Sequence, residues 1–362
     1  MRHEQGAIHA AQGYARAKGV PGVVTVTSGP GATNVITGVA DAMIDSTPLV
    51  VISGQVPTHL LGTDAFQETD VIGLASPITK WCYQIRRVED IEWAVSRAFY
   101  IASSGRPGPV VLDFTATAQR GTAPFTYRKC DFIRTYRPYP AIDADAVAKA
   151  AKMIDEASKP LLVFGQGVIL AGAETELADF LTRSHIPSAS TLLGLSALPD
   201  GFPGYVGMVG MHGNVAPNVM TQECDLLIAV GMRFDDRVTG KIDTYATQAR
   251  KIHIDIDAAE IGKVIPIDCP LLGDAKAILP MLTARIAEKE REDWGITSTI
   301  CNAVELHRVI DPELHPDDEM IHMGEVVNTV AEVSKNSALI VTDVGQNQML
   351  GASYSRFDRT RS

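Results

Sequence analysis

The sequence has little that would tie the protein to a membrane or to nucleic acid. None of its apolar runs approaches the roughly 18 to 20 residues that cross a bilayer, so we expect no membrane partner. Basic residues number 32 against 43 acidic residues, and the basic residues form no long cluster. The formal net charge of −11 therefore argues against a nucleic-acid partner.

Cysteine is also scarce. The five cysteines are widely spaced, which fits neither a zinc site nor a disulfide framework, and we interpret them as small buried hydrophobic residues. The nine histidines show no metal-ligand spacing. The first residues lack the charged and then apolar pattern of a signal peptide. Together these absences predict a reducing, cytoplasmic compartment.

What the sequence does have is an alternation of helix-like and strand-like segments. Its 362 residues are 46% hydrophobic, enough for two or three domains with apolar cores. Short apolar runs alternate with amphipathic segments, a pattern typical of a parallel sheet covered by helices on both faces. The expected elements of the first module are helix 4–18, strand 23–27, a helix ending near residue 44, strand 49–53, helix 88–103 and strand 109–113.

The same alternation continues in a second module and begins again in a third. In the second we expect helix 144–157 with Asp143 as its N-cap, strand 161–164, helix 174–184 and strands 226–230 and 251–256. In the third we expect helix 323–333 and strand 338–342. The expected boundaries are a module at 1–120, a linker at 121–142, a module at 143–288, a linker at 289–318 and the start of a module at 319–362.

Several segments carry residues that could take part in chemistry, and each also has an ordinary reading. The turns 28–34 and 165–167 follow strands and could cradle a phosphate, or could be plain strand-to-helix turns. Glu4 opens a helix, where an acid commonly complements the helix dipole, or it could be a catalytic carboxylate. The charged segment 233–237 follows a buried strand, where α/β sheets place ligands, or it could be a solvated loop.

Taken together and in order, these segments resemble the thiamine-diphosphate-dependent enzymes, and within them the catalytic large subunits of acetolactate synthase (acetohydroxyacid synthase). The likeness extends over essentially the whole chain. The motifs that carry it are Arg2-His3-Glu4-Gln5-Gly6-Ala7, the turn 28–34, Ala65-Phe66-Gln67-Glu68, Ser104-Gly105-Arg106-Pro107-Gly108-Pro109, Gly210-Met211-His212-Gly213, the segment 233–240 and Gly345-Gln346-Asn347-Gln348-Met349.

The resemblance implies a role for residues at both ends of the chain in binding thiamine diphosphate. Glu4 would hydrogen-bond the aminopyrimidine ring and promote loss of a proton from the thiazolium carbon. The catalytic residues implied are Glu4, Phe66 and Gln67, and the cofactor-binding residues are Glu4, Pro30, Asn34, Gln67, Val344, Gln346 and Asn347. Residues 1–120 would then be the pyrimidine-binding domain, and 319–362 the start of the diphosphate-binding domain.

The second module, by the same resemblance, is a Rossmann-like domain that binds FAD, which takes no part in net redox chemistry. The implied FAD-binding residues are Arg106, Gly165, Gly167, Thr191, Leu192, His212, Gly213, Gly231, Arg233, Asp255, Ile256 and Asp274. The implied substrate channel contains Met211, Asp236 and Arg237, and an arginine there would pair with the carboxylate of a keto acid.

The sequence departs from the family pattern in three places. The family's magnesium motif, Gly-Asp-Gly followed by Asn-Asn, is absent, and Gly273-Asp274-Ala275 does not replace it, so we expect the Mg²⁺ ligands to lie beyond the end of this chain. Thr115-Ala116 stands where Pro-Lys is usual, and Asn347 stands where His is usual. We further expect this chain to be a fragment that shows no turnover by itself.

For the intact enzyme the resemblance implies condensation of pyruvate with pyruvate or 2-oxobutyrate, which gives acetolactate or acetohydroxybutyrate for branched-chain amino acids. The family's cofactor lies between two chains, so a homodimer or homotetramer is expected, and a small regulatory subunit is a plausible partner. The alternatives are another thiamine-diphosphate carboligase, oxidase or decarboxylase, and a non-catalytic FAD-binding module. An NAD-dependent dehydrogenase rests only on the imperfect glycine turns.

Overall fold

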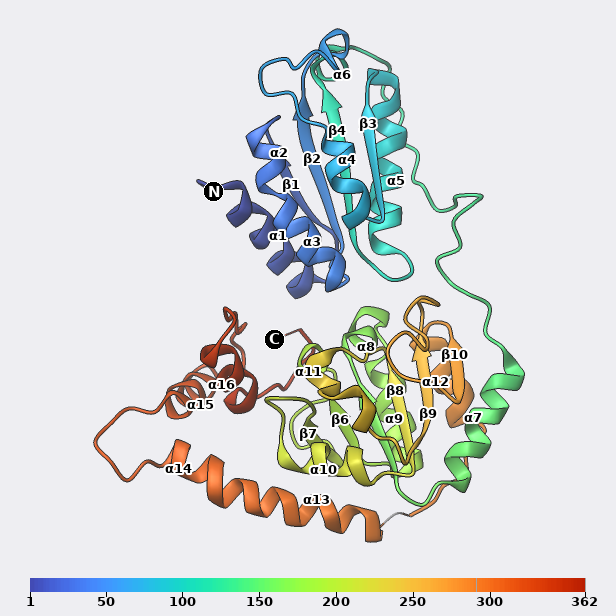
Figure 1. Cartoon of the computed structure of the whole chain (residues 1–362), viewed down its shortest axis with the longest axis vertical. Helices are drawn as coiled ribbons and strands as arrows, with labels where there is room; N and C mark the ends of the chain where they lie inside the picture. Colours follow the sequence, from blue (N-terminus) through green and yellow to red (C-terminus); the bar gives the residue numbers. More distant parts are fainter. Residues whose placement is uncertain (291, 362) are drawn as a thin grey trace. The chain divides into compact units, whose positions relative to one another are not determined.

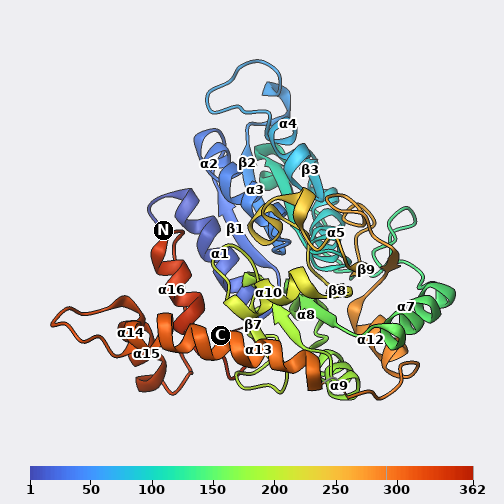
Figure 2. The same ribbon diagram turned by 60° about the horizontal axis from the view of Figure 1, so that its bottom comes forward.

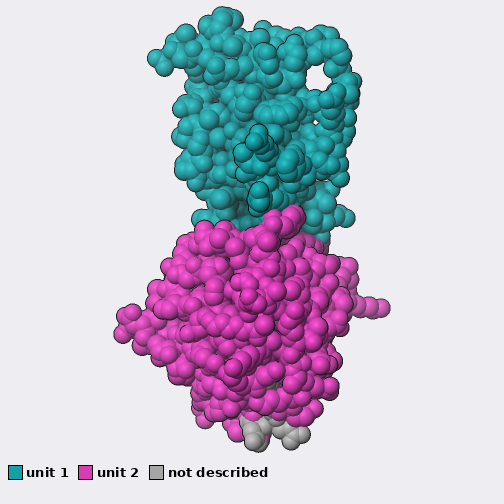
Figure 3. Space-filling model, turned by 90° about the vertical axis from the view of Figure 1, so that its right-hand side faces the viewer, with its two compact units in different colours: residues 1–138 teal, residues 139–362 magenta. Residues whose placement is uncertain are grey.

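The computed structural model describes residues 1–290 and 292–361. The chain divides into two compact units, Met1–Pro138 and Tyr139–Ser362, which Figure 3 colours separately. Each unit is built on a parallel β-sheet, so the predicted α/β class with tandem parallel sheets is confirmed. The division between the units falls inside the segment 121–142 that was expected to be a linker. No helix in the described part of the chain is long and apolar enough to cross a membrane.

The first unit is a four-stranded parallel sheet in the order β1-β2-β4-β3. Its strands are β1 (Gly22–Val26), β2 (Leu49–Gln55), β3 (Trp81–Ile85) and β4 (Pro109–Thr115). Its helices are α1 (Glu4–Lys18), α2 (Pro30–Asn34), α3 (Ile36–Ile44), η1 (Thr58–Leu60), α4 (Val71–Ala75), η2 (Ser76–Ile78), η3 (Val88–Asp90), α5 (Ile91–Ser103) and α6 (Ala116–Arg120). Figure 1 shows α1 and α3 on one side of the sheet and α5 on the other.

Both faces of this sheet are buried because neighbouring side chains of a strand point in opposite directions. In β2, Val51 packs in the cluster formed with α1 and α3, whereas Val50 packs in the cluster formed with α5. A strand covered on both faces reads as a continuous apolar run, which is why 49–53 was predicted correctly. The predicted helix 4–18 is also confirmed, and it ends at Gly19, whose φ of 68° suits a left-handed C-cap.

The structure differs from the sequence-based expectation in two places in this unit. The helix expected to end near residue 44 is divided at Val35 into α2 and α3. Strand β3 was not predicted, because its residues Trp81 to Gln84 are only half-buried and show no alternating pattern. Segment 121–142 forms no helix or strand beyond an isolated bridge between Ile133 and Tyr136. It is nevertheless attached to α5, because Ser96 Oγ donates to the Arg128 carbonyl at 2.6 Å.

The second unit contains a six-stranded parallel sheet in the order β10-β9-β8-β5-β6-β7. Its strands are β5 (Pro160–Phe164), β6 (Ser188–Ser190), β7 (Tyr205–Met208), β8 (Leu226–Val230), β9 (Arg250–Asp255) and β10 (Cys269–Leu272). The helices around it are α7 (Ala144–Glu156), α8 (Gln166–Ala171), α9 (Glu174–Ser184), η4 (Leu192–Gly194), α10 (Val215–Glu223), α11 (Asp236–Thr239), η5 (Ile242–Thr244) and α12 (Ala275–Thr283). This is the strand order of a Rossmann fold, and the order reverses between β5 and β8.

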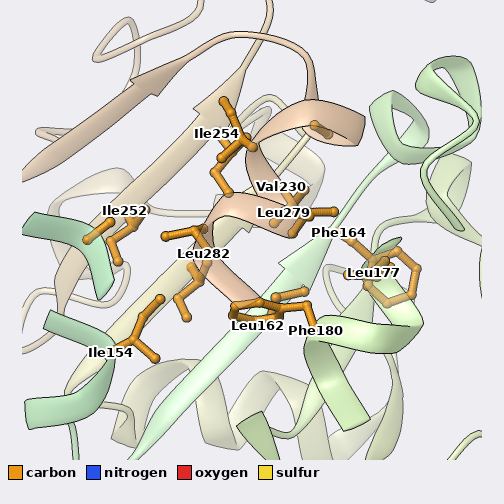
Figure 4. Close-up of a cluster of buried hydrophobic side chains, with 14 of the residues drawn as sticks. Ile154, Leu162, Phe164, Leu177, Phe180, Val230, Ile252, Ile254, Leu279 and Leu282 are labelled. Atoms are coloured by element: carbon orange, nitrogen blue, oxygen red, sulfur yellow. The ribbon is translucent and has the colours of Figure 1, made fainter. Parts of the chain in front are cut away.

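The core of the second unit lies on both faces of the sheet. On one face, drawn in Figure 4, Leu162 and Phe164 of β5 pack with Phe180 of α9 and Leu282 of α12. On the other face the strands pack with α10 and with Trp294 of α13. Figure 2 shows α10 and α13 together, away from α7 and α12. Each fully buried Leu or Phe contributes about 1.5 to 3 kcal/mol by leaving water.

The C-terminal part of the chain differs most from expectation. The range 289–318, expected to be a linker, contains α13 (Glu292–Glu305), a π-helical turn η6 (Leu306–Ile310) and α14 (Asp311–Leu314). The indole Nε1 of Trp294 donates to the Pro160 carbonyl at 2.7 Å, which fixes α13 to the Rossmann sheet. Two further helices follow, α15 (Met323–Val333) and α16 (Gln346–Tyr354).

The predicted strand at 338–342 is wrong, because these residues form no regular element. A parallel strand needs a neighbour that accepts and donates its backbone hydrogen bonds. Neither of the two sheets formed by the described residues includes this segment. Its apolar side chains accordingly remain accessible, with Val341 90% exposed.

Glycines allow very close backbone contact where the strand order reverses. Gly167 N–H donates to the Gly231 carbonyl at 2.8 Å. A Cβ built on Gly231 would lie 2.7 Å from the Cα of Gly167, and Gly231 has a φ of +57°. A side chain at Gly231 would therefore force the turn after β5 away from the end of β8.

We expect Gly231→Ala to destabilise the second unit by about 1 to 3 kcal/mol more than Gly240→Ala, since overpacking costs about this much. Gly240 is a matched control because it has the same φ of +57°, while no atom lies within 4 Å of the position that a Cβ would occupy there. Urea unfolding followed by circular dichroism measures the difference. Equal stability of the two variants would show that the close contact carries no energetic weight.

Candidate functional site

Two predicted residues of the first unit, Glu4 and Asn34, are brought into direct contact. Glu4 begins α1 and Asn34 ends α2, and the Asn34 side-chain amide donates to Glu4 Oε2 at 3.0 Å. This hydrogen bond is the main reason that the pKa of Glu4 lies below its ordinary value. Glu4 is therefore an ionised, partly exposed carboxylate, held in one orientation beside the turn that follows β1.

The same turn also contacts the loop that carries Gln67. Gly29 has a φ of +61°, and a Cβ built on it would lie 2.9 Å from the Cβ of Gln67. Gln67 itself has a φ of 62°, an uncommon conformation for a residue with a side chain. Gly31, two residues further along the chain, has its Cβ position 3.6 Å from Glu4 Oε1. Gly29 thus allows the Gln67 loop to approach, and Gly31 avoids a clash with Thr27, whose Cγ2 lies 2.7 Å from that Cβ position.

Glu68 gives this loop its shape. Its carboxylate accepts backbone N–H groups of Gly62, of Thr63 at 3.2 Å and of Ala65 at 3.1 Å. The Gly62 N–H is the main cause of a pKa for Glu68 below the ordinary value. The clamped loop presents the neighbouring Phe66 to solvent, with 89% of that residue exposed.

In the second unit, the predicted FAD-binding residues follow the carboxyl ends of the six strands. Parallel strands end at the same edge of a sheet, so these residues line one edge. In the order of the sequence they are Gly165 and Gly167 after β5, Thr191 and Leu192 after β6, His212 and Gly213 after β7, Gly231 and Arg233 after β8, Asp255 and Ile256 at the end of β9, and Asp274 after β10.

Some of these residues already have partners within the chain. Gly165 N–H donates to the Val230 carbonyl at 2.9 Å, and Gly167 N–H is also used, so these two groups pack the backbone rather than face a phosphate. Asp274 caps α12 by accepting the Lys276 N–H at 2.9 Å. Asp255 Oδ1 accepts the Asp257 N–H at 2.8 Å.

The three predicted substrate-channel residues also lie together. Met211 N–H donates to the Arg237 carbonyl at 2.8 Å, and Arg237 is paired with its neighbour Asp236 at 3.6 Å. Asp235 caps α11 by accepting the Arg237 N–H at 2.9 Å. The side chains of Asp236 and Arg237 are more than two thirds exposed, so both can reach a ligand from solvent.

Other predicted residues belong to different units. Arg106, predicted to contact FAD, lies in the first unit, where its Nε donates to Ser46 Oγ at 2.8 Å. Pro30 is the first residue of α2, the helix that ends at Asn34. In the second unit, Val344 is 85% exposed, and Gln346 and Asn347 begin α16. Asn347 Oδ1 accepts the N–H of Gln348 at 3.0 Å.

A buried polar group near the Gln67 loop has no counterpart among the predicted site residues. Asp113 is fully buried in β4, and its carboxylate accepts hydrogen bonds from Ser53, Gln55 and Gln84. Beside this group lies a cavity of about 900 Å³, lined by Gln55, Leu61, Gly62, Glu68, Thr69, Asp70, Ile72, Cys82, Tyr83, Gln84, Arg86, Arg87 and Asp90. The available signal was an acid within the apolar run 109–113.

Comparison with known proteins gives this arrangement a family. Residues 1–74 match the N-terminal TPP binding domain of thiamine pyrophosphate enzymes, and residues 147–282 match the central domain of the same enzymes. The chain belongs to the thiamine pyrophosphate enzymes. The glutamate and glycine turn of the first unit thus lie in a TPP-binding domain, and the Rossmann sheet lies in the central domain of this family.

Within the thiamine pyrophosphate enzymes, the chain is a homologue of acetolactate synthase large subunits. It is 44% identical to a probable acetolactate synthase large subunit of Methanocaldococcus jannaschii, over all of this chain and 62% of the relative. Identity is 41% to the large subunit of Corynebacterium glutamicum and 39% to that of Haemophilus influenzae, covering 58% and 64% of those proteins. The chain thus spans about three fifths of the length of these relatives.

The side chains that commonly ligate metals do not gather in the described part of this thiamine pyrophosphate enzyme. Within residues 1–290 and 292–361, no group of three or more His, Cys, Asp or Glu side chains is placed to hold an ion.

The departures Thr115 and Ala116 lie at the start of α6, which Thr115 caps by accepting the Ala118 N–H at 3.3 Å.

We expect Asn34→Ala to raise the pKa of Glu4, because the variant loses the amide that stabilises the ionised carboxylate. Since the folded-state pKa is lowered, the stabilisation that Asn34 provides is present above the ordinary pKa of glutamate and is lost as pH falls through the folded-state value. Carbon-detected NMR titration of the Glu4 carboxyl measures its pKa in the wild type and in the variant. Thr33→Ala is the control, because Thr33 Oγ1 donates to the Pro30 carbonyl instead. A Glu4 pKa that is the same in both variants would contradict the assignment.

Proposed function

We propose that this chain supplies the pyrimidine-binding and FAD-binding domains of an acetolactate synthase. The enzyme would condense pyruvate with pyruvate or 2-oxobutyrate, giving 2-acetolactate or 2-aceto-2-hydroxybutyrate for valine, leucine and isoleucine synthesis. The observation that carries the proposal is the Glu4 carboxylate, oriented by Asn34 at the glycine turn of the TPP-binding domain. The similarity to acetolactate synthase large subunits supports the choice of reaction.

The residues around Glu4 fit the aminopyrimidine ring of thiamine diphosphate. Gly31 adds no side chain next to the carboxylate, since its Cβ position lies 3.6 Å from Glu4 Oε1, and Asn34 offers an amide. When bound, the cofactor supplies an acidic thiazolium carbon and an electron sink for decarboxylation. Glu4 would accept a hydrogen bond from a proton on the pyrimidine ring nitrogen and so hold that proton there, an interaction favoured by a carboxylate that is ionised at neutral pH.

The loop with Phe66 and Gln67 is proposed to cover the reacting atoms. Phe66 exposes a large apolar surface, and its burial against the cofactor and substrate would exclude water from that side. The backbone and Cβ of Gln67 contact the glycine turn next to Glu4, so this residue lies close to where the pyrimidine ring would bind. Glu68 limits the freedom of both residues by clamping the loop backbone.

The central domain is proposed to bind FAD along the carboxyl edge of its sheet. The Rossmann strand order supports this, because dinucleotides bind where that order reverses. Arg233 follows β8 at the reversal and has a guanidinium that can pair with a phosphate. Asp255 ends β9, and its Oδ2 lies 3.7 Å from Nε2 of the buried His253. FAD would take part in no net redox change.

The substrate carboxylate is proposed to bind Arg237. The side chain of Arg237 is 70% exposed, and its guanidinium can form a two-pronged contact with the carboxylate of a 2-oxo acid. The Mg²⁺ ion of the cofactor would take its ligands from outside this chain. We further propose a cytoplasmic homodimer or homotetramer, with a small regulatory subunit as an additional partner.

We expect Glu4→Gln to abolish most acetolactate formation in the protein expressed from its complete gene, because a neutral amide does not hold a proton at the pyrimidine ring nitrogen as a carboxylate does. Bound flavin should remain, since the predicted FAD residues lie elsewhere. A colorimetric assay of acetoin after acid decarboxylation measures the product. Asp41→Asn, a change of an exposed carboxylate on α3, is the control and should retain full activity. Equal turnover of both variants would remove Glu4 from the mechanism.

We also expect the flavin to stay oxidised during turnover with pyruvate, which separates a synthase from an oxidase of the same family. The absorbance of oxidised flavin is followed anaerobically while pyruvate is consumed. The positive control is dithionite, which bleaches the same absorbance. Bleaching by pyruvate alone would replace the synthase assignment with an oxidase.

A further inference from the structure

We infer that a buried hydrogen-bond chain, running from Asp113 through Gln55 to the carbonyl of Thr69, positions the loop that carries Phe66 and Gln67. The inference rests on the proposed function, in which this loop covers the cofactor. It assigns Asp113 and Gln55 as positioning residues, since neither reaches the loop tip or Glu4 itself. The chain lies entirely in the first unit.

The chain begins at a carboxylate that water does not reach. Asp113 is 0% exposed and lies in β4 between Ser53 of β2 and Gln84 of β3, which are its register partners. Ser53 Oγ donates to Oδ1 at 2.9 Å, while Gln84 Nε2 donates to Oδ2 at 2.9 Å and Gln55 Nε2 at 3.2 Å. Burial raises the pKa of Asp113, and these three donors partly offset that effect.

Gln55 links the Asp113 carboxylate to the loop, and both polar atoms of its amide form hydrogen bonds. Its Nε2 donates both to Asp113 Oδ2 and to the Thr69 carbonyl, the latter at 2.7 Å. Its Oε1 accepts the Val56 N–H at 2.9 Å. Rotation of the amide by half a turn would place Nε2 against the Val56 N–H and Oε1 against the oxygens of Asp113 and Thr69. The side chain therefore has one orientation in which its hydrogen bonds are satisfied.

The loop is consequently held on both sides of Gln67. Glu68 ties the backbone to Gly62, Thr63 and Ala65 within the loop, but this clamp does not attach the loop to the sheet. Thr69, two residues beyond Gln67, makes that attachment through Gln55. The left-handed backbone of Gln67 therefore lies between an internal clamp and an anchor in the sheet.

The neighbouring cavity shows why a hydrogen bond is needed here. The space of about 900 Å³ is lined on the loop side by Glu68 and Thr69 and on the sheet side by Gln55 and Gln84. Side-chain packing therefore does not fill the gap between the loop and the ends of β2 and β3. Without the Gln55 bond, the Thr69 carbonyl would keep only the N–H of Val71, at 2.9 Å, among the described residues, and the residues before the buried Val71 would be freer to move into that space.

The test is amide hydrogen exchange of the loop in Gln55→Met, which keeps the length of the side chain but removes both donated hydrogen bonds. We expect peptides covering residues 61–70 to exchange about tenfold faster, because one of the two lost hydrogen bonds, that to the Thr69 carbonyl, holds the loop. Exchange in β1 and β2 should change by less than about twofold. A purely structural role would accelerate the sheet and the loop together.

Ser53→Ala is the matched control, because Ser53 donates to the same carboxylate but does not contact the loop. It should leave exchange at 61–70 within about twofold of the wild type. Asp113→Asn provides a second variant of nearly unchanged volume, in which the loop should again loosen. Unchanged loop exchange in Gln55→Met, or equal acceleration in Gln55→Met and Ser53→Ala, would overturn the inference. Amide exchange requires neither cofactor nor turnover, so its outcome tests the inference independently of the activity measured for Glu4→Gln.

Discussion

The parallel direction of the strands is the constraint on which the other features depend. It brings the carboxyl ends of all strands of a sheet to one edge, and with them the loops and helix starts that can hold polar side chains. In the second unit this edge collects residues from six separate segments between 165 and 274. The close backbone contact of Gly167 with Gly231 occurs where the strand order reverses, so close packing lies beside the edge at which these residues gather.

The sequence predicted those elements best whose signals are local. Helix 174–184 and strand 226–230 were predicted with the bounds that the structure has, the first from helical spacing and the second from an unbroken apolar run. Strand β6 was missed because Ser188-Ala189-Ser190 has no apolar pattern, and it forms only through pairing with β5 and β7. The opposite error occurred at 338–342, where the composition favours a strand but no neighbouring strand pairs with the segment. Strand formation thus depends on partners that composition does not reveal.

The candidate site shows the same limit. Glu4 could be read as a helix-dipole partner or as a catalytic acid, and the structure is compatible with both readings, since Glu4 lies in the first turn of α1 and accepts a hydrogen bond from Asn34. No local pattern connects residues 4 and 34, and only the family resemblance paired them in advance. The group around Asp113 had no such guide. Its donors Ser53, Gln55 and Gln84 come from two other strands, so only the sheet register brings them to one carboxylate.

Comparison of the two carboxylates explains why one suits chemistry and the other suits positioning. Glu4 is accessible and accepts a single side-chain donor, and its lowered pKa favours the ionised form, which can accept a further hydrogen bond from the N–H of a ligand. Asp113 is inaccessible and has three donors, so a ligand could reach it only by displacing bonds that the sheet itself supplies. Burial moves its pKa the opposite way, yet its donors are most satisfied by the ionised form. Environments that differ in this manner suit two like groups to different tasks, and the tasks proposed for them are cofactor binding at Glu4 and a fixed anchor at Asp113.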